Sequence, residues 1–424
     1  MGQAGPRILI VMRRVPTHAR VGNTAVLVAL AEALRDKGAR VDLLVVSARA
    51  FGRRPVERID LPGGSFDHLC CAEAVRLGRW VVAARPGPWM GALRAFAGWI
   101  LRGGRVPSGV WPATLPVTAG EVATVEAELV REPCRAVIAD YVFLAPLARL
   151  AMAHGARGIV YLHDLMSQRH RRFAEQERAP DVPAMTLDEE VGLISGLDAA
   201  VAIQEEEARQ LAAHPAAPPV LVASMPRRTV RAEAVSDPDR LVFVGSDNPA
   251  NVDALEWFLG DVWPRLRARR PNVRLDVVGA IGTAFPDLPQ GVEGHGPVAD
   301  LAPYLSRAAL AIAPQRIGSG LNVKLLDYLA HGLPVVASPL ARAGLKEEAM
   351  TCVLEAGDDE AFAAGIDALL ADDGKRAACR AAAFAYVERH HSPEAVYRGL
   401  FSVIGLDRRP VPPPVTEADS CRRP

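Results

Sequence analysis

The stretch PQRIGSGLNVKLLDYLAHGLPVVASP, residues 314–339, joins a glycine-rich turn directly to a short helix, which is followed by a strand. Gly318 and Gly320 lack a Cβ atom, so the backbone of the turn can approach a ligand closely. The first N–H groups of a helix have no intrahelical partner, and the helix dipole favours an anion beside them. The stretch therefore predicts a phosphate-binding turn within an alternating strand–helix fold.

The helix of this stretch has a polar face and an apolar face. Residues at i, i+3, i+4 and i+7 share one side of a helix, and here they supply a cation suited to phosphate and a carboxylate suited to hydroxyl groups. Gly332 and Pro334 should end the helix. The predicted polar face holds Lys324, Asp327, Tyr328 and His331, and the apolar face holds Val323, Leu326, Leu329 and Ala330.

Short apolar runs alternate with helical patterns along the rest of the chain, which predicts α/β architecture. Strands spaced by helices form parallel sheets covered on both faces. Because the alternation starts again near residue 240, after a segment rich in Ala, Pro and Arg, we expect two doubly wound, Rossmann-like domains with a cleft between them. In the first half, buried strands of the parallel sheet are expected at 7–14, 41–47, 79–86, 135–140 and 158–164, and a strand–helix unit at 199–214.

Bulk composition excludes several classes of protein. The chain has 424 residues, half of them apolar, and a formal net charge of zero, which gives no electrostatic reason to bind nucleic acid. The six cysteines lack metal-ligand spacing, so no metal site is expected. We find neither a signal-peptide pattern nor an apolar run long enough to span a bilayer. These features predict a globular protein in a reducing, cytoplasmic compartment, and they indicate no bound cofactor.

Two segments resemble a known family. LVFVGSDNPANVDALEWFL at 241–259, and the stretch from Gly296 through 339, are similar to the C-terminal domain of glycosyltransferase family 4. The resemblance implies the GT-B fold, in which two Rossmann-like domains face each other across a cleft. It also implies metal-independent transfer of a sugar from a nucleotide diphosphate sugar, with retention of configuration. The implied divisions are an acceptor-side domain at 1–228, a donor domain at 229–391, a helix at 392–406 that crosses back, and a disordered tail at 407–424.

The resemblance assigns places in a donor site. Ser319 and Asp327, which are separated by seven residues, stand where the family has its two glutamates. Asp327 would hold the ribose hydroxyls, while Ser319 would face the transferred sugar without a charge. Where the family has two basic residues after the glycine of strand 241–245, this chain has Ser246 and Asn251, so our hypothesis is that Arg316 and Lys324 replace those cations. The full predicted donor site is Gly22, Gly245, Ser246, Arg316, Gly318, Gly320, Leu321, Asn322, Val323 and Asp327, with His163, Ser319 and Lys324 as catalytic candidates.

In the N-terminal half, the resemblance rests on a polar loop holding Gly22 and on YLHD at 161–164. His163 ends an apolar strand, where it either orients a substrate hydroxyl or is simply hydrogen-bonded at the strand end. The arginines around the Gly22 loop, Arg13, Arg14 and Arg20, are expected to be mostly solvated.

Residues 86–104, PGPWMGALRAFAGWILRGG, combine tryptophans and apolar residues with arginines at the edges. This pattern fits either an interfacial segment that contacts a membrane or a lipid-linked acceptor, or a helix that packs on the sheet. The first alternative would place the protein at the inner face of the membrane.

The predicted function is a retaining glycosyltransferase that moves a sugar to a glycan, glycolipid or other acceptor. An arginine-rich, lysine-poor composition is associated with GC-rich bacterial genomes, where polysaccharide or envelope glycan synthesis is a common role. Two alternatives remain open: a nucleotide-sugar 2-epimerase of the same fold, and a catalytically silent, donor-binding partner subunit of another transferase.

Overall fold

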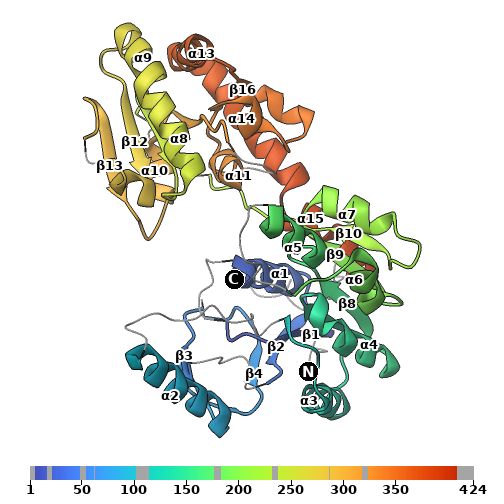
Figure 1. Cartoon of the computed structure of the whole chain (residues 1–424). Coiled ribbons are helices and arrows are strands. Elements are labelled where there is room, and N and C mark those ends of the chain that lie inside the picture. The colour runs from blue at the N-terminus through green and yellow to red at the C-terminus, as the bar shows by residue number, and fades with distance from the viewer. Residues whose placement is uncertain are drawn as a thin grey trace, which may run out of the picture. The chain divides into compact units, whose positions relative to one another are not determined.

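The computed structural model describes residues 5–16, 22–47, 54–61, 63–101, 114–175, 183–231, 237–285, 287–317 and 323–407. The chain forms two compact units (Figure 1). Unit 1 comprises Met1–Met225 together with Val396–Pro424, and unit 2 comprises Pro226–Ala395. The predicted tail lies outside the described residues from position 408 onward.

Unit 1 is built on a seven-stranded parallel sheet with the order β10-β9-β8-β7-β1-β2-β4. The chain enters at β1 in the middle of the sheet, adds β2 on one side, and later adds β7 on the other. All six residues of β1 are buried, as expected for a strand covered on both faces. The strands are β1 (Arg7–Met12), β2 (Arg40–Val45), β4 (His68–Cys71), β7 (Ala136–Asp140), β8 (Arg157–Tyr161), β9 (Ala199–Ala202) and β10 (Val220–Val222).

Helices cover both faces of this sheet, and side-chain alternation along β1 divides the core between them. Ile8 and Ile10 belong to one hydrophobic cluster, which includes α1 (Gly22–Asp36) and α15 (Pro393–Ile404). Leu9 and Val11 belong to the opposite cluster. That second cluster includes residues of α3 (Ala119–Arg131), α4 (Ala145–Ala153) and α6 (Leu187–Ile194).

The expectation for residues 79–86 was wrong. They do not supply a strand to the parallel sheet; β6 (Trp80–Ala83) instead pairs antiparallel with β3 (Val56–Arg58) and β5 (Ala74–Leu77) in a separate three-stranded sheet. A two-residue turn at Gly78 and Arg79 joins β5 to β6, and such short connections produce antiparallel pairs. The helix α2 (Pro86–Leu101) follows β6.

Unit 2 is built on a six-stranded parallel sheet with the order β13-β12-β11-β14-β15-β16. Its first strand, β11, again lies inside the sheet, between β12 and β14. A single hydrophobic cluster spans the unit. The strands are β11 (Arg240–Val244), β12 (Arg274–Val278), β13 (Val292–Gly296), β14 (Leu310–Ala313), β15 (Val335–Ala337) and β16 (Val353–Glu355).

One long helical segment of unit 2 contains a π-helical turn. α8 (Pro249–Trp257) runs through a π-turn at Phe258–Val262 into α9 (Trp263–Arg269). Pro264 has no N–H to donate and its ring crowds the preceding turn, which accounts for the local widening. The segment nevertheless keeps one buried apolar side, since Leu255, Phe258 and Leu266 are fully buried.

The helices of unit 2 are divided between the faces of its sheet. α9 packs against α13 (Asp359–Ala371), while α11 (Val323–Ala330) packs against α14 (Asp373–His390). Ser392 Oγ accepts a hydrogen bond from Ala395 N–H and caps the start of α15. The remaining α-helices are α5 (Met166–Glu175), α7 (Glu205–Ala212), α10 (Ala302–Arg307) and α12 (Pro339–Arg342).

Among the described residues, no helix combines the length and the hydropathy that a bilayer span requires.

Arg13 is not solvated as expected: it is 1% exposed at the carboxyl end of β1. Its Nε and Nη2 atoms donate to the Glu121 carboxylate at 2.9 and 3.0 Å, and Ser47 Oγ donates to the same group at 3.0 Å. Burial raises the pKa of Glu121, but hydrogen bonds from Arg13 and the backbone of Thr118 outweigh it, so the pKa is lowered overall. The pair fixes the start of α3 to the sheet.

We expect Arg13→Met to destabilise unit 1 by about 3 kcal/mol, because it leaves the Glu121 carboxylate buried without its guanidinium. The double variant Arg13→Met/Glu121→Leu should recover most of this loss, since it removes the buried charge as well. Calorimetric melting of the full chain measures both.

The matched control is Arg131→Met, which removes an arginine whose side chain is 65% exposed in its pair with Glu128. Exposed ion pairs contribute roughly 0–1 kcal/mol, so this variant should melt close to the wild type. Equal losses from Arg13→Met and Arg131→Met would contradict the assignment of a buried, stabilising pair.

Candidate functional site

Each parallel sheet has a point where the strand order reverses, and ligands of open α/β sheets bind at the carboxyl ends of the strands there. In unit 2 the reversal lies between β11 and β14, and in unit 1 between β1 and β7. Gly245 and Ser246 follow β11 directly, and Arg316 follows β14. These predicted donor residues therefore lie at the reversal point of unit 2.

Lys324, Asn251 and Ser246 form a hydrogen-bonded chain beside this point. Lys324 Nζ donates to Asn251 Oδ1 at 2.5 Å, and Asn251 Nδ2 donates to the Ser246 carbonyl at 2.8 Å. Asn251 is 3% exposed, so its amide is held firmly between the two groups. The chain connects the start of α11 with the loop after β11, which are separated by more than seventy residues.

The Lys324 ammonium lies in an apolar setting. Its Nζ is 5.4 Å from the centroid of the Phe243 ring. Burial lowers the pKa of Lys324 to about 8, because the low-dielectric surroundings disfavour the charged form. A buried cation beside the carboxyl ends of the strands is suited to bind an anion, which would also restore its usual protonation.

Arg316 and Asp327 are both engaged by residues that the sequence interpretation did not include. Arg316 Nη2 donates to Asp253 at 2.9 Å, and its guanidinium lies 5.3 Å from the Trp257 ring centroid. Asp327 Oδ1 accepts a hydrogen bond from Arg227 Nε at 2.5 Å. Sequence could not indicate Arg227, because it precedes Asp327 by a hundred residues in a segment without regular structure.

The predicted polar and apolar faces of α11 are wrong at two residues. Tyr328 is 1% exposed and its hydroxyl accepts a hydrogen bond from Val244 N–H at 2.8 Å, so it belongs to the core. Val323 is 47% exposed, so it is not part of the apolar face. The eight-residue helix packs Leu325, Leu326 and Leu329 inward, which turns the buried sector away from the predicted one.

The remaining donor predictions fall on close backbone contacts or outside the described residues. A Cβ atom at Gly245 would lie 3.0 Å from Ile281 Cγ2, so the turn after β11 is tightly packed. Gly22 is the first residue of α1 and not a loop residue as expected. Gly318, Ser319, Gly320, Leu321 and Asn322 lie outside the described residues.

In unit 1, His163 forms a buried pair with Asp140 beside the sheet's reversal point. His163 Nε2 lies 2.7 Å from Asp140 Oδ1, and the side chains are 5% and 3% exposed. Tyr141, whose φ of 68° is strained for a residue other than glycine, stacks obliquely on the imidazole with centroids 4.6 Å apart. Asp140 was missed, although a carboxylate that directly ends a buried strand could have been recognised from the sequence.

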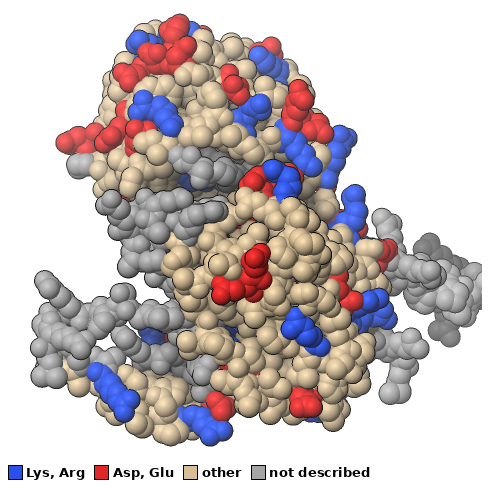
Figure 2. All heavy atoms as spheres, turned by 45° about the vertical axis from the view of Figure 1, so that its right-hand side comes forward, with Lys and Arg blue, Asp and Glu red and all other residues tan. Residues whose placement is uncertain are grey.

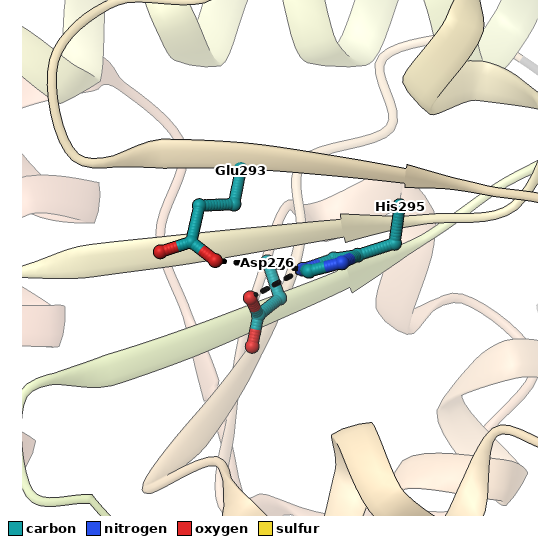
Figure 3. Close-up of side chains that lie close together, drawn as sticks. All are labelled: Asp276, Glu293 and His295. Atoms are coloured by element: carbon teal, nitrogen blue, oxygen red, sulfur yellow. Dashed lines mark hydrogen bonds and ion pairs between the residues drawn. The ribbon is translucent and has the colours of Figure 1, made fainter.

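A second cluster, of Asp276, Glu293 and His295, has ligand atoms within 4.8 Å of one another (Figure 3). Asp276 is already saturated: Arg240 and Arg307 donate to its carboxylate at 2.9 and 3.0 Å, and His295 Nε2 lies 2.7 Å away. Two guanidinium groups offset the negative charge that a divalent cation requires. We interpret this cluster as an ion network that joins β11, β12 and β13.

Surface charge of the described residues is mixed. In the view of Figure 2, Lys and Arg side chains are interspersed with Asp and Glu side chains over both units. Nucleic-acid binding requires a concentrated basic surface, and this face does not provide one.

Comparison with known proteins agrees with the fold. Residues 238–372, which include β11, α8 and α11, match the family of group 1 glycosyl transferases. No curated protein sequence matches the chain at a significant level.

Several solved structures share the fold. TarM superposes with a TM-score of 0.57 at 9% identity, over 94% of this chain and 98% of its own. Sucrose-phosphate synthase from Thermosynechococcus elongatus gives 0.56 at 16% identity, over 94% and 99%. HepE from Anabaena, solved in complex with UDP, gives 0.53 at 14% identity, over 94% and 99%. The predicted GT-B class, with two Rossmann-like units, is thereby confirmed.

Lys324→Met tests the buried charge without any ligand. The pKa of Lys324 is about 8 when folded and about 10.5 when unfolded, so the unfolded chain binds more protons between these values. The stability of wild-type unit 2 should therefore rise with pH across that window. Lys324→Met should raise the melting temperature by a few degrees at neutral pH, and this gain should shrink toward pH 10.5.

The exposed Lys375 provides the control, since Lys375→Met removes the same charge from a solvated position. If both variants raise the melting temperature equally, or if the rise for Lys324→Met does not change with pH, burial of the Lys324 ammonium does not destabilise the fold.

Proposed function

We propose that the protein is a metal-independent glycosyltransferase that takes its sugar from a nucleotide diphosphate donor held by unit 2. The observation that carries this proposal is the half-buried Lys324 ammonium on Asn251, beside the reversal point of the sheet. It lies in the part of the chain that matches group 1 glycosyl transferases. HepE, which has the same fold, has been solved with UDP and with UDP-glucose.

Lys324 is assigned to the diphosphate. Asn251 orients its ammonium, while the start of α11 adds N–H groups that point toward an anion. In this arrangement α11 supplies the cation. Ser246 and Asn251, which stand where the family has basic residues, hold the Lys324 ammonium in place. Arg316 would contribute only by leaving Asp253, since their ion pair has a distance of 2.9 Å.

Asp327 is assigned to the ribose hydroxyls. One of its oxygens accepts the Arg227 hydrogen bond, and that bond fixes the direction of the carboxylate. The second oxygen is then turned to accept hydroxyl donors. Ser319, with a hydroxyl in place of the family glutamate, is assigned to the transferred sugar.

The proposed chemistry follows from charge development at the leaving group. As the sugar–phosphate bond breaks, negative charge grows on the diphosphate, and fixed donors aimed at it lower the barrier. Lys324 and the amides of Gly320 to Val323 are the proposed donors. The acceptor hydroxyl attacks from the same face and its proton passes to the leaving phosphate, so the configuration is retained. His163, oriented by Asp140, would hold a substrate hydroxyl.

We extend the proposal to polysaccharide or envelope glycan synthesis on the cytoplasmic side of a bacterial membrane, with a glycan, glycolipid or lipid-linked acceptor. Two other functions use the same donor site. A nucleotide-sugar 2-epimerase would return an altered donor and release no nucleoside diphosphate. A silent partner subunit would bind a donor, or nothing, and turn over neither substrate.

The direct test is nucleotide binding. In a thermal-shift screen with UDP, GDP and ADP, one of the three nucleotides should raise the melting temperature. Lys324→Met should lower the affinity for that nucleotide by roughly 10- to 100-fold, because a charge-assisted hydrogen bond is lost. The affinity should also fall as pH rises through about 8, where Lys324 loses its proton.

Lys375→Met is again the control and should leave the affinity unchanged. Stabilisation by none of the three nucleotides would contradict the proposed donor site. With a suitable nucleotide sugar, release of the diphosphate together with sugar transfer identifies a transferase, whereas an epimerised donor identifies an epimerase.

His163→Asn tests the proposed role of His163 in unit 1. We expect kcat to fall by about 100-fold while the affinity for the free nucleotide stays the same, because His163 belongs to unit 1 and the nucleotide site to unit 2. Asp140→Asn keeps a hydrogen-bonding group and should cost less. If His163→Asn keeps full activity and only lowers the melting temperature, the histidine is structural.

A further inference from the structure

The small antiparallel sheet of unit 1 has an apolar outer face. Its register places Val56, Val82 and Val75 side by side in one row across the three strands. The next row on the same face holds Arg58, Trp80 and Leu77, because alternate residues of a strand point the same way. We call Val56, Val75, Leu77, Trp80 and Val82 the apolar face.

This face is open to solvent although its residues are apolar. Leu77 is 62%, Val75 52% and Trp80 50% exposed, while Val81 on the opposite side of the sheet is fully buried. An antiparallel sheet normally has a polar solvent face when its other face is packed on the core. Contiguous apolar exposure of this kind marks an interaction surface.

The β5–β6 turn forms the exposed end of the face. Leu77 and Trp80 lie directly opposite each other, and Gly78 and Arg79 connect them. The Arg79 side chain is 71% exposed and lies 3.6 Å from Asp60. Paired leucine and tryptophan side chains at a turn, with an arginine between them, have the composition of an interfacial membrane contact.

Helix α2, which follows β6, carries exposed apolar side chains of its own. Its Trp89 donates Nε1–H to the Ala83 carbonyl at the end of β6, at 2.9 Å, which ties the helix to the sheet. Trp89 and Leu93, one helical turn apart, are 45% and 68% exposed, and Met90 beside them is 47% exposed. The apolar face and this side of α2 together carry most of the exposed large apolar side chains described in unit 1.

The charges around this surface indicate what kind of partner it would bind. Residues 74–101 contain four arginines and no acidic residue. Arg79 and Arg85 pair with Asp60 and Glu73. Among the described residues, no carboxylate pairs with Arg58, which lies on the apolar face, or with Arg94 of α2. Apolar side chains with arginines around them complement a surface that is both apolar and negatively charged.

We propose that the apolar face and α2 bind the surface of an anionic lipid bilayer. Leu77, Trp80, Trp89 and Leu93 enter the boundary between headgroups and acyl chains, and the arginines contact lipid phosphates. A second copy of the chain is a poorer partner, because a symmetric contact would place the arginines of one copy against those of the other. The surface belongs to unit 1, so this proposal does not rest on the proposed transferase activity.

Vesicle binding by the full chain tests the proposal. Sedimentation with vesicles of phosphatidylcholine and phosphatidylglycerol should exceed that with phosphatidylcholine alone. Leu77→Ser/Trp80→Ser should lower the binding constant at least about tenfold, since two large apolar contacts are lost. Arg58→Gln/Arg94→Gln should lower it by about fivefold per arginine and remove the preference for anionic vesicles.

The matched control is Val130→Ser/Met350→Ser, which removes two apolar side chains that are 70% and 45% exposed elsewhere on the surface; it should bind vesicles like the wild type. All variants should melt near the wild-type temperature, because every changed side chain is exposed. Failure of the wild type to bind anionic vesicles, or an equal loss in the control, overturns the proposal. A lipid-free dimer that Leu77→Ser/Trp80→Ser dissociates would assign the face to self-association instead.

Discussion

Parallel strands bring their carboxyl ends to one edge of a sheet, and in both units the first strand lies inside the sheet, where the order reverses. The proposed donor site of unit 2 and the His163–Asp140 pair of unit 1 both depend on this constraint. It places the turn after β11 beside the segment after β14, and it places Asp140 at the end of β7 beside His163 after β8. Residues remote in sequence become neighbours without any local signal.

Within unit 2, burial of a single ammonium shapes the proposed site. Lys324 is held by Asn251 and lies over the Phe243 ring, and burial lowers its pKa to about 8. A cation that is costly to hold in low-dielectric surroundings interacts more strongly with a bound diphosphate, because the same low dielectric strengthens the attraction. The saturated network around Asp276 is the contrasting case, since its charges already balance one another.

Much of the fold could be predicted from sequence, because fully buried parallel strands leave uninterrupted apolar runs. β1, β2, β7, β8 and β11 were all recognised in this way. The error at β6 has the same origin, since WVVA reads as a buried strand although only alternate residues of it face the core. Pairing partners are set by turn length and by the surrounding packing, which an apolar run does not encode.

The sequence predicted which residues belong to the candidate site, but it did not predict which residues they contact. Sequence indicated Lys324, Asp327 and His163, but their partners Asn251, Arg227 and Asp140 came only from the fold. Tyr328 shows why: helical spacing assigned it to the polar face, yet its hydroxyl bonds to Val244 N–H in the core.

By itself, the sequence determined the alternation of strands and helices and the groups available for binding, because these depend on local backbone preference and periodicity. The tertiary structure decided which charges are paired, how deeply Lys324 is buried, and that the small sheet of unit 1 shows an apolar face to solvent. Those properties depend on which segments pack together across the chain, and local sequence does not fix that packing.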